Sequence, residues 1–196
     1  MKMCVKGFSN PWDYYLAKSQ ELCGRYKNPR VLKADSCNEA SNQPIKGGIA
    51  GNLNGEIVCI EINPSSVQRA RENCPEVEIM LGDIAGIPFI NDNFDVILDL
   101  STIDHIRFDQ LDYQLREYRR VLHEKGRLLL ISWVTDNLKY KEEQAKIPLT
   151  NHDYQYFHNH NDMARVINNI FYVEKGERIL EESDIYLMAY WLFKRA

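Results

Sequence analysis

The sequence of 196 residues lacks both an excess of positive charge and any long hydrophobic run. Its formal net charge of −4 gives no reason to expect nucleic acid as a partner, because binding phosphates needs a basic surface. No segment approaches the roughly 20 apolar residues of a membrane span, and the N-terminus lacks an apolar stretch typical of a signal peptide. We therefore expect a soluble, cytoplasmic protein with no membrane partner.

The sequence also lacks the cysteine and histidine spacings of disulfide-rich and zinc-binding proteins. Its five cysteines are odd in number and include no Cys-x-x-Cys pair, so we expect reduced thiols. His158 and His160 beside His152 have no dependable zinc spacing, so we expect no bound metal. No repeat, low-complexity segment or linker divides the chain, and we expect a single domain over residues 1–196.

What the sequence does contain is a regular alternation of strand-like and helix-like patterns. Five apolar runs have the length and composition of strands: 30–34, 56–62, 76–81, 94–100 and 127–133. Two further strands close the chain and predict an antiparallel hairpin. The alternation predicts an α/β fold, Rossmann-like and doubly wound, whose mostly parallel seven-stranded sheet carries that hairpin at its end.

Helix starts and two flanking segments complete the expected fold. Asn63 can cap a helix with Pro64 in its first position, and Asp109 can cap a second helix. A third helix starts near residue 161, with Asn161 or Asp162 as its cap. Residues 1–29 would form an N-terminal helical cap, and the polar and aromatic residues 134–160 a lid over the site.

Sheets of this kind bind ligands beyond the carboxyl ends of their strands, which here are residues 35–39, 61–62, 83–84 and 99–105. Glu61 follows the second strand, where a carboxylate can accept hydrogen bonds from both ribose hydroxyls of an adenosine. After the third strand, Asp83 could accept from an adenine amino group while Ile84 packs on the base. The alternative, that each carboxylate only caps a turn, stays open.

The turn after the first strand has no glycine where nucleotide-binding turns have several. Asp35 and Glu39 would face the pyrophosphate of NAD or FAD, and two like charges 4 Å apart repel by about 4 kcal/mol at an effective dielectric of 20. S-adenosylmethionine carries no phosphate, and its sulfonium and ammonium groups are positive. A turn that disfavours a dinucleotide could therefore favour this cofactor.

Residues 30 to 135 resemble the class I S-adenosylmethionine-dependent methyltransferases. "VCIEINPSSVQRAR" matches their strand-two acid and following helix, "GDIAGIPFINDNFDVILDLSTIDHI" their adenine-contact and strand-four motifs, and "EYRRVLHEKGRLLLISW" their helix into strand five. "VLKADSCNE" matches their first motif in position, although Lys33 replaces its acid. The resemblance implies methyl transfer with S-adenosylmethionine as cofactor. It implies these cofactor-binding residues: Asp35, Cys37, Glu39, Glu61, Ile62, Asp83, Ile84, Asp99 and Ser101.

The chemistry and the acceptor are predicted from fewer residues. His105 is the candidate general base and Asp104 its orienting carboxylate, with a purely structural histidine as the alternative. The aromatic stretch 8–15 and the lid suggest a pocket for a small-molecule or carbohydrate-like acceptor. A homodimer stays open, and so does a different class: a methyltransferase-fold binding or scaffold protein that has lost the cofactor. An NAD-dependent oxidoreductase is disfavoured by the charge of the first turn.

Overall fold

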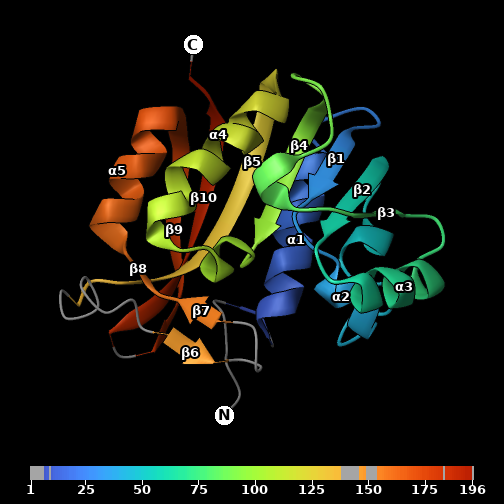
Figure 1. The fold of residues 1–196 in the computed structure, drawn as a ribbon, viewed down its shortest axis with the longest axis horizontal. Coiled ribbons are helices and arrows are strands. Elements are labelled where there is room, and N and C mark those ends of the chain that lie inside the picture. The colour runs from blue at the N-terminus through green and yellow to red at the C-terminus, as the bar shows by residue number, and fades with distance from the viewer. Residues whose placement is uncertain (1–6, 9, 138–145, 149–153, 183, 196) are drawn as a thin grey trace.

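The computed structural model describes residues 7–8, 10–137, 146–148, 154–182 and 184–195. Its main sheet has the strand order β3-β2-β1-β4-β5-β10-β9 (Figure 1). The strands are β1 (Arg30–Lys33), β2 (Glu56–Glu61), β3 (Glu78–Leu81), β4 (Phe94–Leu100), β5 (Leu122–Thr135), β9 (Phe171–Glu182) and β10 (Ile185–Lys194). Strand order reverses between β1 and β4, which places a ligand site at their carboxyl ends.

The pairing of the strands confirms the predicted fold class. β1 pairs in parallel with β2 and β4, and β4 pairs in parallel with β5. β10 runs antiparallel to both β5 and β9, as expected of the closing hairpin. A short strand β8 (His158–Asn159) adds to β5, and β6 (Lys146–Pro148) pairs with β7 (Tyr154–Tyr156) in a separate small sheet.

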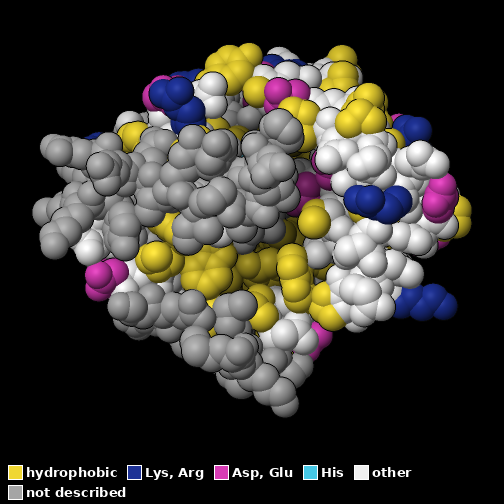
Figure 2. Space-filling model, turned by 60° about the horizontal axis from the view of Figure 1, so that its bottom comes forward, with side chains coloured by type: hydrophobic (Ala, Val, Ile, Leu, Met, Phe, Trp, Pro, Cys, Tyr) yellow, Lys and Arg dark blue, Asp and Glu magenta, His cyan; other side chains and the backbone are white. Residues whose placement is uncertain are grey.

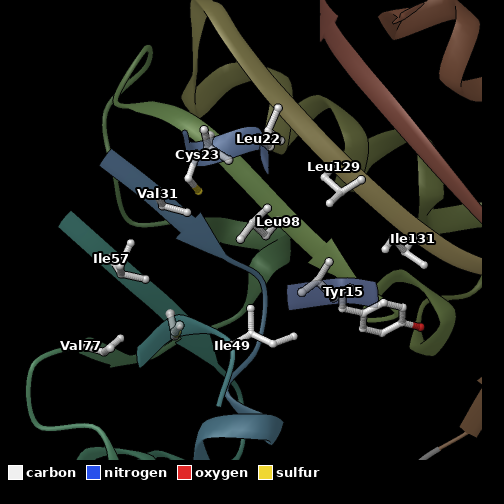
Figure 3. Packing of buried hydrophobic residues seen from close by; sticks show 14 of the residues in the cluster. Tyr15, Leu22, Cys23, Val31, Ile49, Ile57, Val77, Leu98, Leu129 and Ile131 are labelled. Carbon is white, nitrogen blue, oxygen red and sulfur yellow. The ribbon is translucent and has the colours of Figure 1, made fainter. Parts of the chain in front are cut away.

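Helices cover both faces of the sheet (Figure 1). The helices are α1 (Pro11–Cys23), α2 (Cys37–Ser41), α3 (Pro64–Asn73), α4 (Leu111–Val121) and α5 (His160–Ile170). Val31 on β1 packs into one core with α1 and α3, whereas its neighbour Leu32 packs into a second core with α4 and α5. Figure 3 shows the first of these cores, in which Leu22 and Cys23 of α1 pack in one cluster with Val31 of β1 and Leu98 of β4. The alternation of side chains along a strand divides the two cores.

One predicted helix cap is confirmed and two are wrong. Asn63 caps α3, with Pro64 in its first turn. Asp109 does not cap α4: it lies in the 3-10 turn η4 (Phe108–Gln110), ion-pairs with Arg107 at 2.8 Å, and leaves Gln110 at the cap position. The cap of α5 is Asn159, whose side chain accepts from the backbone N–H groups of Asn161 and Asp162. The helix starts earlier because β8 ends there.

The four described cysteines, Cys23, Cys37, Cys59 and Cys74, are free thiols. None of the helices in the described ranges is long and apolar enough to cross a membrane. His152 lies outside the described residues.

Candidate functional site

The carboxyl ends of the parallel strands form the face where the sequence predicts a site. Figure 2 looks at this end of the molecule and shows hydrophobic side chains gathered in a hollow near its middle. Three parts of the chain meet at this face. The first is the turn after β1, and the second is formed by the neighbouring ends of β2 and β3. The third is the loop after β4, which contains the 3-10 turn η3 (Ile103–His105).

The turn after β1 is built around a buried lysine. The Lys33 side chain is 1% exposed, and its ammonium lies 2.7 Å from Asp35 Oδ1 and 3.1 Å from Glu39 Oε2. Burial by itself would lower the pKa of Lys33, but the carboxylates of Asp35 and Glu39 raise it well above its usual value. The lysine is therefore held charged, and the two acids of this glycine-free turn, Asp35 and Glu39, serve as its counter-ions.

Glu39 points into the protein. Its carboxylate is fully buried, and Oε1 accepts a hydrogen bond of 2.8 Å from the backbone N–H of Ala50. Gly48 has φ +62°, and a Cβ there would lie 2.7 Å from Glu39 Oε1 and from its backbone nitrogen. The segment that follows α2 can pack onto this carboxylate because residue 48 is glycine. The prediction that Glu39 contacts a cofactor stays a prediction, since the structure gives its carboxylate internal partners.

Asp35 links the turn to the loop after β4. One carboxylate oxygen accepts from Lys33 Nζ and from the backbone N–H of Cys37, and the other accepts from the Thr102 hydroxyl. Burial would raise the pKa of Asp35, but the Lys33 ammonium outweighs it and the pKa is lowered. Asp35 is therefore ionised and still partly exposed, with 22% of its side chain accessible. Cys37 is exposed beside it.

Glu61 lies at the end of β2, as predicted, and is 8% exposed. One oxygen accepts from the backbone N–H of Ser36 at 3.0 Å, and the other from the backbone N–H of Asn63 at 2.8 Å. These bonds fix the carboxylate between the first turn and the start of α3. Oε2 also accepts from the Ser36 hydroxyl at 3.3 Å, whereas Oε1 has a second lone pair that can accept a hydrogen bond from a ligand.

Beside Glu61 the surface is apolar and open. Ile62 is 69% exposed, and Ile84 is half-buried in the 3-10 turn η2 (Ile84–Gly86) after β3. Asp83 is exposed and accepts from the backbone N–H of Ala85 at 2.8 Å, so it caps this turn. The two carboxylates and the two isoleucines thus lie at the ends of neighbouring strands, as the sequence predicted.

The loop after β4 is fixed by two buried carboxyls. Asp99 accepts from the backbone N–H groups of Thr102 and Ile103 and from the Tyr118 hydroxyl. Asp104 accepts from the Ser132 hydroxyl and from the backbone N–H of Trp133, both on β5. Burial raises the pKa of Asp99 to about 7 and that of Asp104 to about 8. Asp99 therefore serves here as a turn cap, and cofactor binding by it stays a prediction.

The two predicted catalytic residues face different surroundings. Asp104 is fully buried, and its second oxygen, Oδ2, has no hydrogen-bond partner among the described residues. His105 is exposed at the end of η3, next to the loop residues that contact the first turn. The carboxyl of Asp104 fixes the turn that carries His105 to β5, so it supports the position of the imidazole through the backbone.

Three residues of the site were not predicted from the sequence. Lys33 is the central cation, Thr102 connects the loop after β4 to Asp35, and Tyr15 reaches the loop from α1. Only Lys33 left a signal: a lysine inside a run of buried apolar residues needs a paired charge, and acids follow it at positions 35 and 39. The Tyr15 and Thr102 contacts join segments far apart in the chain.

Comparisons by sequence agree with this arrangement. Residues 46–130 match a family described as a methyltransferase domain. Two probable S-adenosylmethionine-dependent methyltransferases from two strains of Mycobacterium tuberculosis are each 28% identical over 113 residues. The alignment includes 58% of this chain and 38% of each relative, so it spans less than two fifths of the relatives' length.

Comparisons by structure find the same fold over nearly the whole chain. The PH0226 protein from Pyrococcus horikoshii superposes with a TM-score of 0.70 at 19% identity, over 94% of this chain and 91% of that one. A Burkholderia thailandensis 1,6-didemethyltoxoflavin-N1-methyltransferase, solved with S-adenosylhomocysteine, gives 0.65 at 13% identity, over 95% and 79%. The [4+2]-cyclase SpnF gives 0.73 at 14% identity, over 94% and 81%. In sequence, residues 46–130 are thus similar to a methyltransferase domain, and in strand order and fold the chain is similar to class I S-adenosylmethionine-dependent methyltransferases.

Proposed function

We propose that the protein is an S-adenosylmethionine-dependent methyltransferase that acts on a small-molecule acceptor. The observation that carries this proposal is the adenosine-type edge formed by Glu61, Ile62 and Asp83 at the ends of two neighbouring strands. A fixed carboxylate with a free lone pair on Oε1, an exposed apolar side chain next to it and a second carboxylate one strand away match the hydroxyl, aromatic and amino groups of an adenosine.

The described residues fit the other end of the cofactor as well. Glu39 points inward, so Asp35 and Cys37 are the two replaced glycine positions whose side chains border the face. Asp35 is ionised, and a carboxylate suits the ammonium and sulfonium groups of S-adenosylmethionine. When bound, this cofactor supplies a methyl group activated by the positive sulfur.

The chain's own residues would bind, orient and shield the reactants. Glu61 would hold the ribose hydroxyls, Ile62 and Ile84 the base, and Asp83 its amino group. His105 would remove a proton from the acceptor where one must leave, because its imidazole is exposed at the end of η3 beside the site. Holding the two reactants in line is the main requirement of such a transfer.

The acceptor is proposed as a small molecule, with a carbohydrate-like compound as one form of it. Two structural neighbours whose names state a small-molecule substrate support a small-molecule acceptor. One was solved with 1,6-didemethyltoxoflavin bound, and the other is a geranyl diphosphate C-methyltransferase. Trp12 and Trp133 are half-buried aromatic side chains near this end of the sheet, on α1 and β5. They would offer apolar walls to a compact acceptor.

A second candidate function is favoured by the first turn. Asp35 and Glu39 neutralise Lys33, and the Asp35–Thr102 hydrogen bond joins the two loops between which the methionine end of the cofactor would lie. A protein that kept the fold as a binding or scaffold domain would tolerate these contacts. The neighbour SpnF is named as a cyclase, so the fold alone does not fix the reaction.

Calorimetric titration with S-adenosylhomocysteine separates the two functions. We expect saturable binding, and a ligand concentration 100 times the dissociation constant should add about 2.7 kcal/mol to the stability. NAD is the matched control ligand, because it carries the same adenosine with a pyrophosphate, and it should bind far more weakly. Absence of both heat and thermal shift at millimolar S-adenosylhomocysteine would favour the scaffold.

A further inference from the structure

The N-terminal helix α1 contacts the candidate site through one buried hydroxyl. Tyr15 is 3% exposed, and its hydroxyl forms a hydrogen bond of 3.1 Å with Ser101 Oγ. Ser101 is the first residue after β4. Figure 3 shows the Tyr15 ring beside the end of this strand, beyond Leu98. The ring is fixed from its other side by Trp12, in an edge contact with 5.4 Å between centroids.

Ser101 is held in a strained conformation. Its φ of 73° lies in the left-handed region, which costs a non-glycine residue roughly 1–2 kcal/mol. Two hydrogen bonds hold it there: its backbone N–H donates to Ile131 O at 2.9 Å, and its side chain binds Tyr15. The conformation of Ser101 sets the direction of the chain after β4. It thereby places the next residue, Thr102, where its hydroxyl donates to Asp35.

We propose that Tyr15 is a positioning residue of the ligand site: its hydroxyl, acting through Ser101, holds the loop 101–105 in the conformation that places Thr102 against Asp35. The contacts form one path from α1 to the first turn, through Tyr15, Ser101, Thr102 and Asp35 to the Lys33 ammonium. The helix α1 thus packs on the sheet and also positions a loop of the site. The effect on cofactor affinity rests on the proposed function, whereas the effect on the loop does not.

Tyr14 supplies a matched control on the same helix. It is 2% exposed, and its hydroxyl donates to Glu177 Oε2 at 3.4 Å, away from the loop. Tyr15→Phe and Tyr14→Phe therefore each remove one hydroxyl from an equally buried ring of α1. A merely structural role of the helix would give the two variants the same phenotype.

Hydrogen exchange tests the positioning without any ligand. The backbone N–H groups of Thr102 and Ile103 are bonded to Asp99 and report on the loop. Losing one hydrogen bond of about 1 kcal/mol should speed their exchange roughly fivefold in Tyr15→Phe and leave it unchanged in Tyr14→Phe. Equal exchange in wild type and Tyr15→Phe, or equal acceleration in both variants, would overturn the proposal.

Ligand affinity and a double-mutant cycle test the consequence for the site. We expect Tyr15→Phe to weaken S-adenosylhomocysteine binding roughly three- to tenfold, with a melting temperature equal to that of Tyr14→Phe. Ser101→Ala removes the same bond and also a hydroxyl that interacts with Asp104, so it should weaken binding at least as much, and adding Tyr15→Phe to it should weaken binding no further. Unchanged affinity in Tyr15→Phe, with wild type binding, would refute the role in the site. If wild type does not bind, the proposed function fails, and the exchange rates still decide the role of Tyr15.

Discussion

The two halves of the candidate site differ in how their polar groups are engaged. At the ends of β2 and β3, Glu61 and Asp83 bond, within the described part of the chain, to backbone N–H groups and one neighbouring hydroxyl, next to the exposed Ile62. In the first turn, Asp35 and Glu39 pair with a buried ammonium and with other loops. The first half is open to a ligand, and the second is tied into the structure of the protein. Departures from a family's pattern can thus be compensated locally while the neighbouring half keeps its geometry.

The largest effect is expected from breaking the ion cluster of the first turn. Lys33→Met would leave the buried Glu39 carboxylate and the partly exposed Asp35 carboxylate without their cation, and the free energy of unfolding should fall by about 3–5 kcal/mol. Urea denaturation measures this loss. Lys27→Met, at an exposed lysine, is the control and should change little. Adding Glu39→Gln to Lys33→Met should restore part of the stability; a loss below about 1 kcal/mol in Lys33→Met would show that the cluster is not a structural unit.

The next largest effect is expected at the open half. Glu61→Ala should weaken S-adenosylhomocysteine binding roughly 100-fold, because each hydrogen bond to a charged group contributes about 1.5–3 kcal/mol. Glu56→Ala is the matched control, since Glu56 lies at the opposite end of the same strand with a side chain that is 59% exposed. Calorimetry gives both constants. Wild-type affinity in Glu61→Ala would remove the ribose assignment.

A smaller and more selective effect is expected at Asp35. Asp35→Asn keeps the shape of the side chain and removes its charge. It should weaken S-adenosylmethionine binding roughly tenfold, and S-adenosylhomocysteine binding less, because only the former carries the sulfonium charge. The ratio of the two affinities is the measurement. Tighter binding of both ligands in Asp35→Asn would mean that the carboxylate obstructs the site.

The smallest expected effect concerns the pH dependence of stability. The folded-state pKa of Asp104 is raised to about 8 by burial, above the value near 4 of an unfolded aspartate. Between these values the folded state holds the extra proton, so stability falls as pH rises from about 4 to 8. Asp104→Asn cannot ionise, so its stability relative to wild type should increase by about 1 kcal/mol between pH 7 and 8, because one bound proton corresponds to about 1.36 kcal/mol per pH unit.

Thermal unfolding at several pH values checks the Asp104 prediction. Asp112→Asn, at an exposed aspartate paired with Arg116, is the control and should follow the wild-type profile. The difference between Asp104→Asn and wild type should shrink toward pH 4. A difference that does not change with pH would mean that Asp104 is ionised throughout this range.

Much of the fold followed from local pattern. The strands, their parallel pairing and the closing hairpin could be predicted because buried runs of β-branched residues alternate with capped helices. The two cap assignments failed for different reasons. Near residue 109 a local contact decides, because Asp109 lies in the turn η4 and ion-pairs with Arg107. Near residue 161 long-range pairing decides, because β8 pairs with β5 and the chain leaves the sheet at Asn159.

The site was predictable in position and less so in contacts. The ends of the strands could be predicted from the sequence. The positions of Glu61, Ile62, Asp83 and Ile84 at or just beyond these ends could therefore be predicted as well. The partners of Lys33 and the Tyr15–Ser101 bond were not foreseen. Pairing a buried charge, and packing a helix hydroxyl against a loop 86 residues away, are decided by the tertiary structure.

The outer strand β9 has a consequence for the behaviour of the protein at high concentration. It ends the main sheet and leaves one row of backbone N–H and C=O groups without a neighbouring strand among the described elements. Its side chains include Glu174, Lys175, Glu177 and Arg178, and bulges interrupt its register with β10. Charged side chains and bulges on an edge strand disfavour the addition of a strand from another chain. We therefore expect this edge of the sheet to resist fibrous aggregation.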